Sequence, residues 1–584
     1  MAQHLEKCVV YQSRIAEETG GPTQQKLNLK QQPLRVRSVS KEEQAKLEKK
    51  AGYAIYCGAR PFSMFMEPYM KDLILNLEPA FELPSNRTFA TTILDLCYEE
   101  TKAEVFDVLR RSHFLNVSLD ESSNIKRDRI INICILTNFG PFCLRYELVG
   151  VGTSSAERIA EWLVNQLEIL EIDIGQKLPT INSLTTDTCA TMRSLWELLR
   201  TYDRFKYALF VPCDSHGLQL LIKDIISHSM FKDTMKTAQD IVVHFRKSHK
   251  QLALLREYQQ KIYNQQYALT LAGETRWGTQ WNLLSHLKRS KEALRAFAYD
   301  GENDCDNRPV LDAIYDYSFW ADVDELLDIL EPIHKHQIAS ESSEKGLDKV
   351  YARWRDIKSH CSRHPRHSGE LKRLFKHRCN KQLSTIHHIT WLLHPENQSQ
   401  GLASGEQTKM YDFIKEIQSQ ETYIKAEKGF IDYRMMRQGF ESRELWDPDI
   451  KSDPITFWSF ALQYSPEIAE LAIRLFETPA NSVPCERAFS TMNLTHTKYR
   501  NRLTVERMHK LCFVHINRRI LDRPRGAMKK RLDELDETEA IELESTLLEA
   551  PLDDAYTTST GETGDVETAE GLAETSSRRR RLGE

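Results

Sequence analysis

Two aspartates close predicted β-strands, a position at which mixed sheets often place ligand-binding side chains. Asp120 follows the run FLNVSL, and Asp187 follows TINSLTT. Ligands bind beyond the carboxyl ends of the strands in such sheets, so both carboxylates can face one crevice. The alternative for each residue is a turn or a helix cap, the usual role of a single aspartate after a strand.

A third carboxylate, Glu486, lies far along the chain in the stretch SVPCERAF. Ser482 and Pro484 favour a helix start there, because serine caps helices and proline is tolerated in a first turn. Glu486 and Phe489 are then three residues apart on one helix face. The alternative is an ordinary glutamate in the first turn of a core helix. Carboxylate oxygens suit Mg²⁺ or Mn²⁺, so three converging acids would predict a metal-binding site.

Helices are predicted on both sides of Glu486. Before it, apolar residues repeat at helical spacing through Ile468, Leu471, Ala472, Leu475 and Phe476. After it, the repeat continues through Met508, Leu511 and His515. Three short helices therefore surround this carboxylate.

The aspartates lie in a region with a different period. FLNVSLD, RIINICILTNFG and FCLRYELVGV are three strand-like runs separated by polar turns. A helix follows, with Ser154 and Glu157 as a capping box and a buried face formed by Ile159, Trp162, Leu163 and Leu167. TINSLTTD, CATMRSLWELLR and KYALFVPC then read as strand, helix and strand. The pattern predicts an α/β sheet that begins as a meander.

Residues 217–453 separate Asp187 from Glu486 and are predicted to be helical, being far too long for a loop. Within them, the stretch 351–381 is dense in Lys, Arg and His, including Arg363, Arg366, Arg373 and Lys376. Such a run is either a solvated face or a surface for DNA phosphates, bound with release of counterions. Cys361, His364 and His367 lack a full set of metal ligands, and no metal site is predicted there.

Composition sets the class of protein. The 584 residues and an apolar fraction of 41% can build two or three cores. No stretch approaches a membrane span, and no apolar run follows a basic start. The net charge of −5 hides an acidic end: before Asp533 the chain carries 75 Lys and Arg against 68 Asp and Glu. This mildly basic body is compatible with a nucleic-acid partner, and the scattered 12 cysteines fit a reducing compartment.

Two Cys–His pairs raise the question of zinc. His4 and Cys8 have the H-x3-C spacing of half a zinc finger, and Cys213 and His216 form a C-x2-H pair. Neither has a second pair at finger spacing, and zinc requires four ligands in a structural site. Zinc is therefore not expected in this chain.

Several of these motifs together resemble the hAT transposase superfamily. The motifs are PFS and LPS in the region 61–85, the Trp458 helix, Pro479-Ala480, ERAFS at 486–490 and RNRL at 500–503. The resemblance covers about Ala54 to Asn517. It implies an RNase H-like fold interrupted by a helical insertion, with Asp120, Asp187 and Glu486 as a DDE catalytic triad. By the same resemblance, Cys213, His216 and Arg487 support the active site, and His4 with Cys8 is the remnant of a BED zinc finger.

The family pattern T-R-W gives a further expectation at Arg276 and Trp277. By resemblance, Trp277 would stack on an unpaired base and Arg276 would lie beside a phosphate. The alternative for Trp277 is a helix-packing aromatic residue. Two divalent ions, Mg²⁺ or Mn²⁺, held by the triad would activate water or a 3′ hydroxyl and stabilise the leaving oxygen. The resemblance implies cut-and-paste transposition, with hairpins left on the flanking DNA.

The expected domains are a disordered arm (1–40), an N-terminal helical region (41–112), the first part of the RNase H-like core (113–216), the helical insertion (217–453), a C-terminal core part with the dimerisation region (454–520) and a disordered acidic tail (521–584). We expect a nuclear, self-associating DNA transposase that acts on transposon ends. A catalytically idle, host-adopted DNA-binding protein is the alternative, and a general RNase H-type nuclease is disfavoured by the large insertion.

Overall fold

The computed structural model describes residues 39–123, 128–149, 155–273, 278–300, 305–342, 346–401, 405–495 and 503–522. His4 and Cys8 lie outside these ranges, as do Arg276 and Trp277. The described residues form two compact units, which divide between Glu99 and Glu100, and each has its own architecture. The domain boundaries expected from the sequence stay predictions.

The first unit is a set of short helices delimited by prolines and serine caps. It contains α3 (Lys41–Cys57), η1 (Met64–Met66), α4 (Pro68–Leu77) and α5 (Asn86–Ala90), and α6 (Thr92–Arg111) starts within it. Ser40 and Glu43 form a capping box at the start of α3. Gly52 allows close packing there, because a Cβ at this residue would lie 2.6 Å from Ile93 Cγ2.

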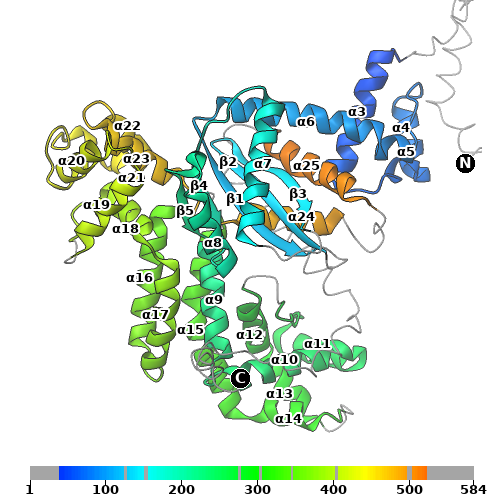
Figure 1. Ribbon diagram of the computed structural model, residues 1–584. Coiled ribbons are helices and arrows are strands. Elements are labelled where there is room, and N and C mark those ends of the chain that lie inside the picture. Colours follow the sequence, from blue (N-terminus) through cyan, green and yellow to red (C-terminus); the bar gives the residue numbers. More distant parts are fainter. Residues whose placement is uncertain are drawn as a thin grey trace, which may run out of the picture. The chain divides into compact units, whose positions relative to one another are not determined.

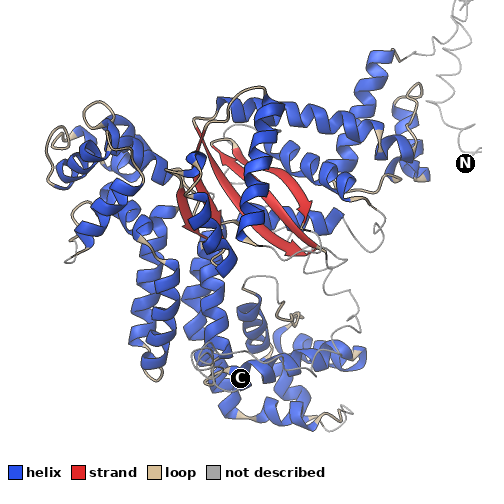
Figure 2. Cartoon of the chain, viewed as in Figure 1, coloured by secondary structure: helices blue, strands red, loops and turns tan. Residues whose placement is uncertain are grey.

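The second unit contains a mixed five-stranded sheet (Figures 1 and 2). Its strands are β1 (Phe114–Ser123), β2 (Arg129–Thr137), β3 (Gly140–Leu148), β4 (Thr180–Thr186) and β5 (Leu209–Pro212), in the order β3-β2-β1-β4-β5. The first three pair antiparallel, which confirms the meander, and β4 runs parallel to both β1 and β5. The expected α/β sheet with a large helical insertion is thus present.

Helices α7 (Ala156–Ile174) and α8 (Ala190–Leu199) flank β4 in the chain, and the short η2 (Asp203–Phe205) precedes β5. Two details differ from the sequence prediction. The N-cap of α7 is Ser155, whose side chain accepts a hydrogen bond from the Arg158 amide, whereas Ser154 lies outside the described residues. Trp162 is partly rather than fully buried, and its indole Nε1 donates to Glu147 Oε2 of β3 at 2.8 Å.

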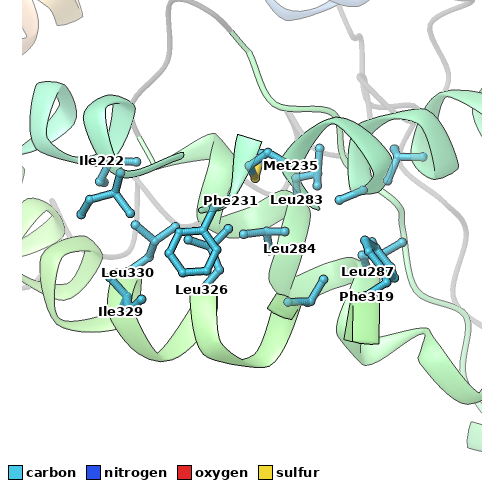
Figure 3. Close-up of a cluster of buried hydrophobic side chains, with 14 of the residues drawn as sticks. Ile222, Phe231, Met235, Leu283, Leu284, Leu287, Phe319, Leu326, Ile329 and Leu330 are labelled. Carbon is cyan, nitrogen blue, oxygen red and sulfur yellow. The ribbon is translucent and has the colours of Figure 1, made fainter. Parts of the chain in front are cut away.

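The helical insertion begins directly after β5 and has two apolar cores. Its first helices are α9 (Asp214–Ser227), α10 (Lys232–Lys247), α11 (His249–Tyr263), α12 (Thr279–Arg289), α13 (Lys291–Tyr299), α14 (Arg308–Tyr315), α15 (Tyr317–Ser342), α16 (Leu347–Arg363) and α17 (Ser368–Gln382). These share one cluster of buried side chains, part of which Figure 3 shows. Leu326, Ile329 and Leu330 of α15 pack there with Phe231, which follows the helical spacing of the apolar residues.

The second core joins the rest of the insertion to the region before Glu486. It includes α18 (Thr385–Leu393), η3 (Pro395–Asn397), α19 (Glu406–Glu416), α20 (Tyr423–Arg434), η4 (Glu444–Trp446), α21 (Pro448–Ser452), α22 (Pro454–Ala461) and α23 (Pro466–Phe476). Trp458 is fully buried there and donates from Nε1 to Leu393 O at 2.9 Å.

The last two described helices, α24 (Val483–Thr495) and α25 (Val505–Leu521), pack against the sheet. Met508, Leu511 and His515 are buried on α25, as the helical spacing predicts. Asn517 of α25 pairs with the edge strand β3: the Cys143 amide donates to Asn517 Oδ1 at 2.9 Å, and Asn517 Nδ2 donates to Cys143 O at 2.8 Å. The register of β2 and β3 shifts at Cys134, so Asn517 satisfies the backbone where the ladder is irregular.

No helix in the described ranges is long and apolar enough to cross a membrane.

The Asn517 contact gives a first prediction. Asn517→Ala leaves the buried amide and carbonyl of Cys143 without partners, so we expect the free energy of unfolding to fall by about 2–3 kcal/mol. Chemical denaturation followed by circular dichroism measures it. The exposed Asn380→Ala is the matched control and should change stability by less than about 0.5 kcal/mol. Equal stability of the two variants would contradict the assigned role of Asn517.

Candidate active site

Asp120 and Asp187 lie at the same edge of the sheet. Strands β1 and β4 are parallel neighbours, and Ser118 is opposite Thr185. Continuing this register by two residues sets Asp120 level with Asp187, which follows β4 directly. Both side chains keep part of their surface exposed. The structure therefore brings the two aspartates together, as their positions at strand ends predict.

Glu486 reaches the same point because α24 crosses a row of side chains on one face of the sheet. Asp120 pairs with Asn132 of β2, which pairs with Tyr146 of β3. Asn132 Nδ2 donates to Cys485 O at 2.9 Å, and Tyr146 OH donates to Ala488 O at 2.6 Å. These two bonds anchor the backbone on either side of Glu486.

The turn before α24 is fastened to the end of β5 and to the insertion. Asp214 N donates to Ala480 O at 2.9 Å, and Ser482 N donates to Cys213 Sγ at 3.4 Å. Asn481 Nδ2 donates to Ser340 O of α15 at 2.7 Å. The position of Glu486 is thus fixed by contacts with strands and with the helical insertion.

Asp120 is coupled electrostatically to each of the other two acids. Burial and the neighbouring charge of Asp187 raise the pKa of Asp120 to about 8, because both disfavour a second negative charge. Burial, followed by Asp120 and Glu341, raises the pKa of Glu486 well above its usual value, while Arg487 acts in the opposite direction. Asp120 is therefore the common neighbour of Asp187 and Glu486.

Cys213 and His216 line the same site. Burial and the Glu486 carboxyl raise the pKa of the Cys213 thiol, so it stays protonated at neutral pH. Burial lowers the pKa of His216, an effect that Asp187 opposes and Lys223 and Arg378 reinforce. In the C-x2-H pair, Cys213 therefore lies near Glu486 and His216 lies near Asp187. Arg487 is exposed and donates from Nη2 to Glu341 O at 3.3 Å.

The turn interpretation of the aspartates also holds in part. Asp187 Oδ1 accepts a hydrogen bond from Cys189 N at 3.1 Å, which helps to start α8. Asp120 Oδ1 accepts one from Glu121 N at 3.0 Å. Each carboxylate retains a second oxygen for other ligands.

The three carboxyl groups suit a hard divalent cation, because such cations prefer oxygen ligands. Asp120 is coupled to each of the other two acids. The carboxyl groups do not converge on one point, however: in the described part of the chain, no group of three or more His, Cys, Asp or Glu residues is arranged to hold a metal.

Asp214 is a site residue that the sequence analysis did not identify. It is fully buried, and its Oδ2 accepts from Arg353 Nη1 at 2.7 Å and from Ser340 Oγ at 2.9 Å. Its Oδ1 accepts from Trp354 Nε1 at 2.8 Å. The sequence gives no sign of these partners, which come from distant helices. Arg353 belongs to the basic stretch 351–381. Because it is buried and paired with Asp214, it is not part of a DNA-facing surface.

The expected DNA-binding residues of the insertion are exposed, with local partners. Arg366 binds Glu325, with Nε donating to Oε1 at 2.8 Å, and Arg373 Nε donates to Glu370 Oε2 at 2.9 Å. Arg363 and Lys376 are exposed as well. His364 and His367 stack on each other and lie 3.7 and 3.6 Å from Glu325 Oε1. These two histidines therefore contact a buried acid.

Two family models match parts of this chain. Residues 436–517 match the hAT family C-terminal dimerisation region, and residues 211–313 match the ZBED1 RNase-like helical domain. The first match contains Glu486, and the second contains Cys213 and His216. Zinc finger BED domain-containing protein 4 of Homo sapiens is 21% identical over 348 residues. That alignment covers 53% of this chain and 29% of the relative.

The acid cluster predicts how stability depends on pH in the metal-free protein. The folded pKa of Asp120 is about 8, above its ordinary 3.8, so the folded state holds this proton more tightly than the unfolded state. The stability contributed by the protonated carboxyl is complete below pH 3.8 and lost as pH rises through about 8. We expect the melting temperature measured in EDTA to fall over this window, and less so for Asp120→Asn.

The exposed acid Asp203 provides the control. Asp203→Asn should keep the wild-type pH profile. Identical profiles for Asp120→Asn and the wild type would show that Asp120 does not lie in the proposed charge environment.

The buried ion pair gives a further prediction. Arg353→Met leaves the Asp214 carboxylate buried without its cation, which should lower the free energy of unfolding by about 3–5 kcal/mol. The double variant Asp214→Asn/Arg353→Met should recover part of that loss. Arg355→Met, which removes an exposed guanidinium lying over Trp391, should cost about 1 kcal/mol or less. A loss of the same size for both arginines would argue against the pair.

Proposed function

We propose that this chain, a hAT-type transposase-like protein, cleaves and joins DNA strands with Asp120, Asp187 and Glu486 as its catalytic acids. The observation that carries the proposal is the electrostatic coupling of carboxyl groups from three separate segments. A glutamate that served only in the first turn of a helix would not need to lie close to Asp120, whose other acidic neighbour is Asp187. Neighbouring acids with raised pKa values are typical of functional sites.

The order of the strands supports an RNase H-like core within this proposal. Three antiparallel strands are followed by two parallel ones, and the helical insertion separates β5 from α24. The insertion would therefore add surface for DNA without disturbing the sheet that carries the acids.

Asp120, Asp187 and Glu486 would hold the Mg²⁺ or Mn²⁺ ions. When bound, such ions lower the pKa of an attacking water and stabilise the leaving oxygen of a phosphodiester. The chain's own groups do the positioning. Cys213, as a neutral thiol, accepts from the Ser482 amide and so orients the start of α24. His216 has a lowered pKa and is neutral at pH 7, so it offers a hydrogen bond beside Asp187 without a positive charge.

DNA would approach along α17. This helix packs beside α9, with Gln382 Nε2 donating to Pro212 O at 3.0 Å near the acids and Arg378 Nη2 donating to Asp224 Oδ1 at 2.6 Å further along. Arg373 and Lys376 are exposed on α17. Its basic face would therefore lead phosphates towards Asp187, with Arg363 and Arg366 extending the contact. Arg276 and Trp277 remain expected DNA contacts by resemblance alone.

The protein would act in the nucleus and in association with a second copy of itself. Self-association is supported by the match to a dimerisation region. A nuclear location follows from DNA as the substrate. The alternative is a host-adopted protein that binds DNA and associates but no longer cleaves, and the cleavage assay decides between the two.

The cleavage assay uses purified protein, Mn²⁺ and a labelled duplex that carries the terminal repeats of the transposon. We expect nicks or hairpins with the wild type, and a rate about 100-fold lower for Asp120→Asn, because a group that stabilises transition-state charge is lost. Asp203→Asn should retain the wild-type rate. A folded, DNA-binding wild type that does not cleave would favour the idle alternative.

DNA binding is tested separately through its salt dependence. Arg373→Ala and Lys376→Ala should each weaken binding of any sequence and reduce the slope of log affinity against log salt by about 1. Lys409→Ala, an exposed lysine on α19, is the control and should leave the slope unchanged. Unchanged slopes for all three variants would exclude α17 as the DNA surface.

A further inference from the structure

Three tyrosines stay exposed where α13, α14 and α15 follow one another in the insertion. Tyr299 ends α13, Tyr315 ends α14 and Tyr317 starts α15. Their side chains are 75%, 39% and 77% exposed, in that order. Helices α13 and α14 pack against each other (Figure 1). Single exposed apolar side chains are common, whereas a group of them on adjoining elements is typical of a surface that binds a partner.

The apolar pattern of α14 directs one of these tyrosines outward. The helix buries its apolar residues in the first core of the insertion, namely Val310, Leu311 and Ile314. Its exposed side carries Asp312 and Tyr315. These two residues are three positions apart, so they are neighbours on the helix surface.

Tyr315 is held in place before any partner binds. Its hydroxyl donates to Ala298 O at the end of α13, and its ring lies 4.9 Å from the ring of Tyr299. The two rings meet at 77°, nearly a right angle. A pair of rings that is already fixed loses less conformational entropy on binding than two mobile side chains.

Carboxylates lie beside these rings. Asp316 follows Tyr315 directly, and its Oδ1 accepts from the hydroxyl and from the amide of Ser318, each at 2.8 Å. These hydrogen bonds lower the pKa of Asp316, so this carboxyl is ionised at neutral pH. The described residues from 299 to 318 carry four aspartates and one basic residue, Arg308. The surface around the tyrosines is therefore acidic.

We propose that a lysine- and arginine-rich segment of another protein binds at this surface, which we call the tyrosine–aspartate face. The face consists of Tyr299, Asp312, Tyr315, Asp316 and Tyr317. A lysine or arginine charge is attracted to a tyrosine ring within about 6 Å of its centroid, and the aliphatic stem of such a side chain covers apolar surface. The carboxylates complement the same charge.

The acidic character of the face also separates it from the proposed DNA surface. Asp312 and Asp316 would repel phosphates, because like charges placed opposite each other cost free energy. The exposed basic residues of α17, by contrast, would attract them. The inference therefore adds a protein partner to the proposed function and does not depend on DNA cleavage.

The test measures how a fluorescein-labelled octapeptide of alternating lysine and glycine binds to the full chain, by fluorescence anisotropy. We expect Tyr299→Ser to weaken binding about 2- to 5-fold, the effect of one exposed cation–π contact. Tyr299→Ser/Asp312→Asn should weaken it about 10-fold. Tyr299→Phe keeps the ring and should bind like the wild type. Both residues are exposed, so the variants should keep the wild-type circular dichroism.

Matched controls remove an exposed tyrosine and an exposed acid elsewhere, in Tyr69→Ser and Asp203→Asn. Both should bind the peptide like the wild type, and an octapeptide of alternating glutamate and glycine should not bind. All variants keep the acidic stretch after Asp533, so its attraction for the peptide is the same in each comparison.

The proposal is overturned if Tyr299→Ser binds the lysine peptide as tightly as the wild type, or if Tyr299→Phe loses as much affinity as Tyr299→Ser. It is also overturned if the wild type binds the lysine and glutamate peptides equally. A Tyr299→Ser variant that binds DNA more weakly, or whose mass by light scattering is lower, would assign the face to DNA or to a second copy instead.

Discussion

The site depends on the docking of the C-terminal helices onto the sheet through buried amide side chains. Asn132 holds the backbone next to Glu486, and Asn116 Nδ2 donates to Glu477 O at 3.0 Å. Asn182 Nδ2 donates to Asn116 Oδ1 at 2.8 Å and to Arg474 O at 3.1 Å. Buried polar groups are costly unless paired, so these bonds favour one register of the segment over all others. Without that register, Glu486 would not meet the two aspartates.

The helical insertion takes part in the same arrangement. Its first helix, α9, begins next to Cys213 and contains His216. Asp214 connects the start of α9 to α15 and α16 through fully buried hydrogen bonds. The end of α15 also contacts Asn481 and Arg487, which flank the third acid in sequence. A movement of the insertion would therefore move the acids. The same helices carry the basic surface proposed for DNA. The surface proposed for DNA and the acids would therefore share one framework.

The sequence was a good guide where local pattern decides structure. Runs of Val, Ile and Leu predicted the strands, and Ser482 with Pro484 predicted the start of α24, because period and turn chemistry are local properties. It failed at Asp214 and Arg353, whose pairing depends on the packing of distant helices. Asn132 carried a usable sign, a polar residue inside an apolar strand.

The central claim is that Asp120, Asp187 and Glu486 form one metal-binding site, although Glu486 comes from a distant part of the sequence. Electron paramagnetic resonance of Mn²⁺ titrated into the full chain without DNA tests it most directly. The account predicts that Glu486→Gln weakens Mn²⁺ binding about as much as Asp120→Asn does, by roughly 10-fold or more, while Asp203→Asn has no effect. Wild-type Mn²⁺ affinity in Glu486→Gln would contradict it.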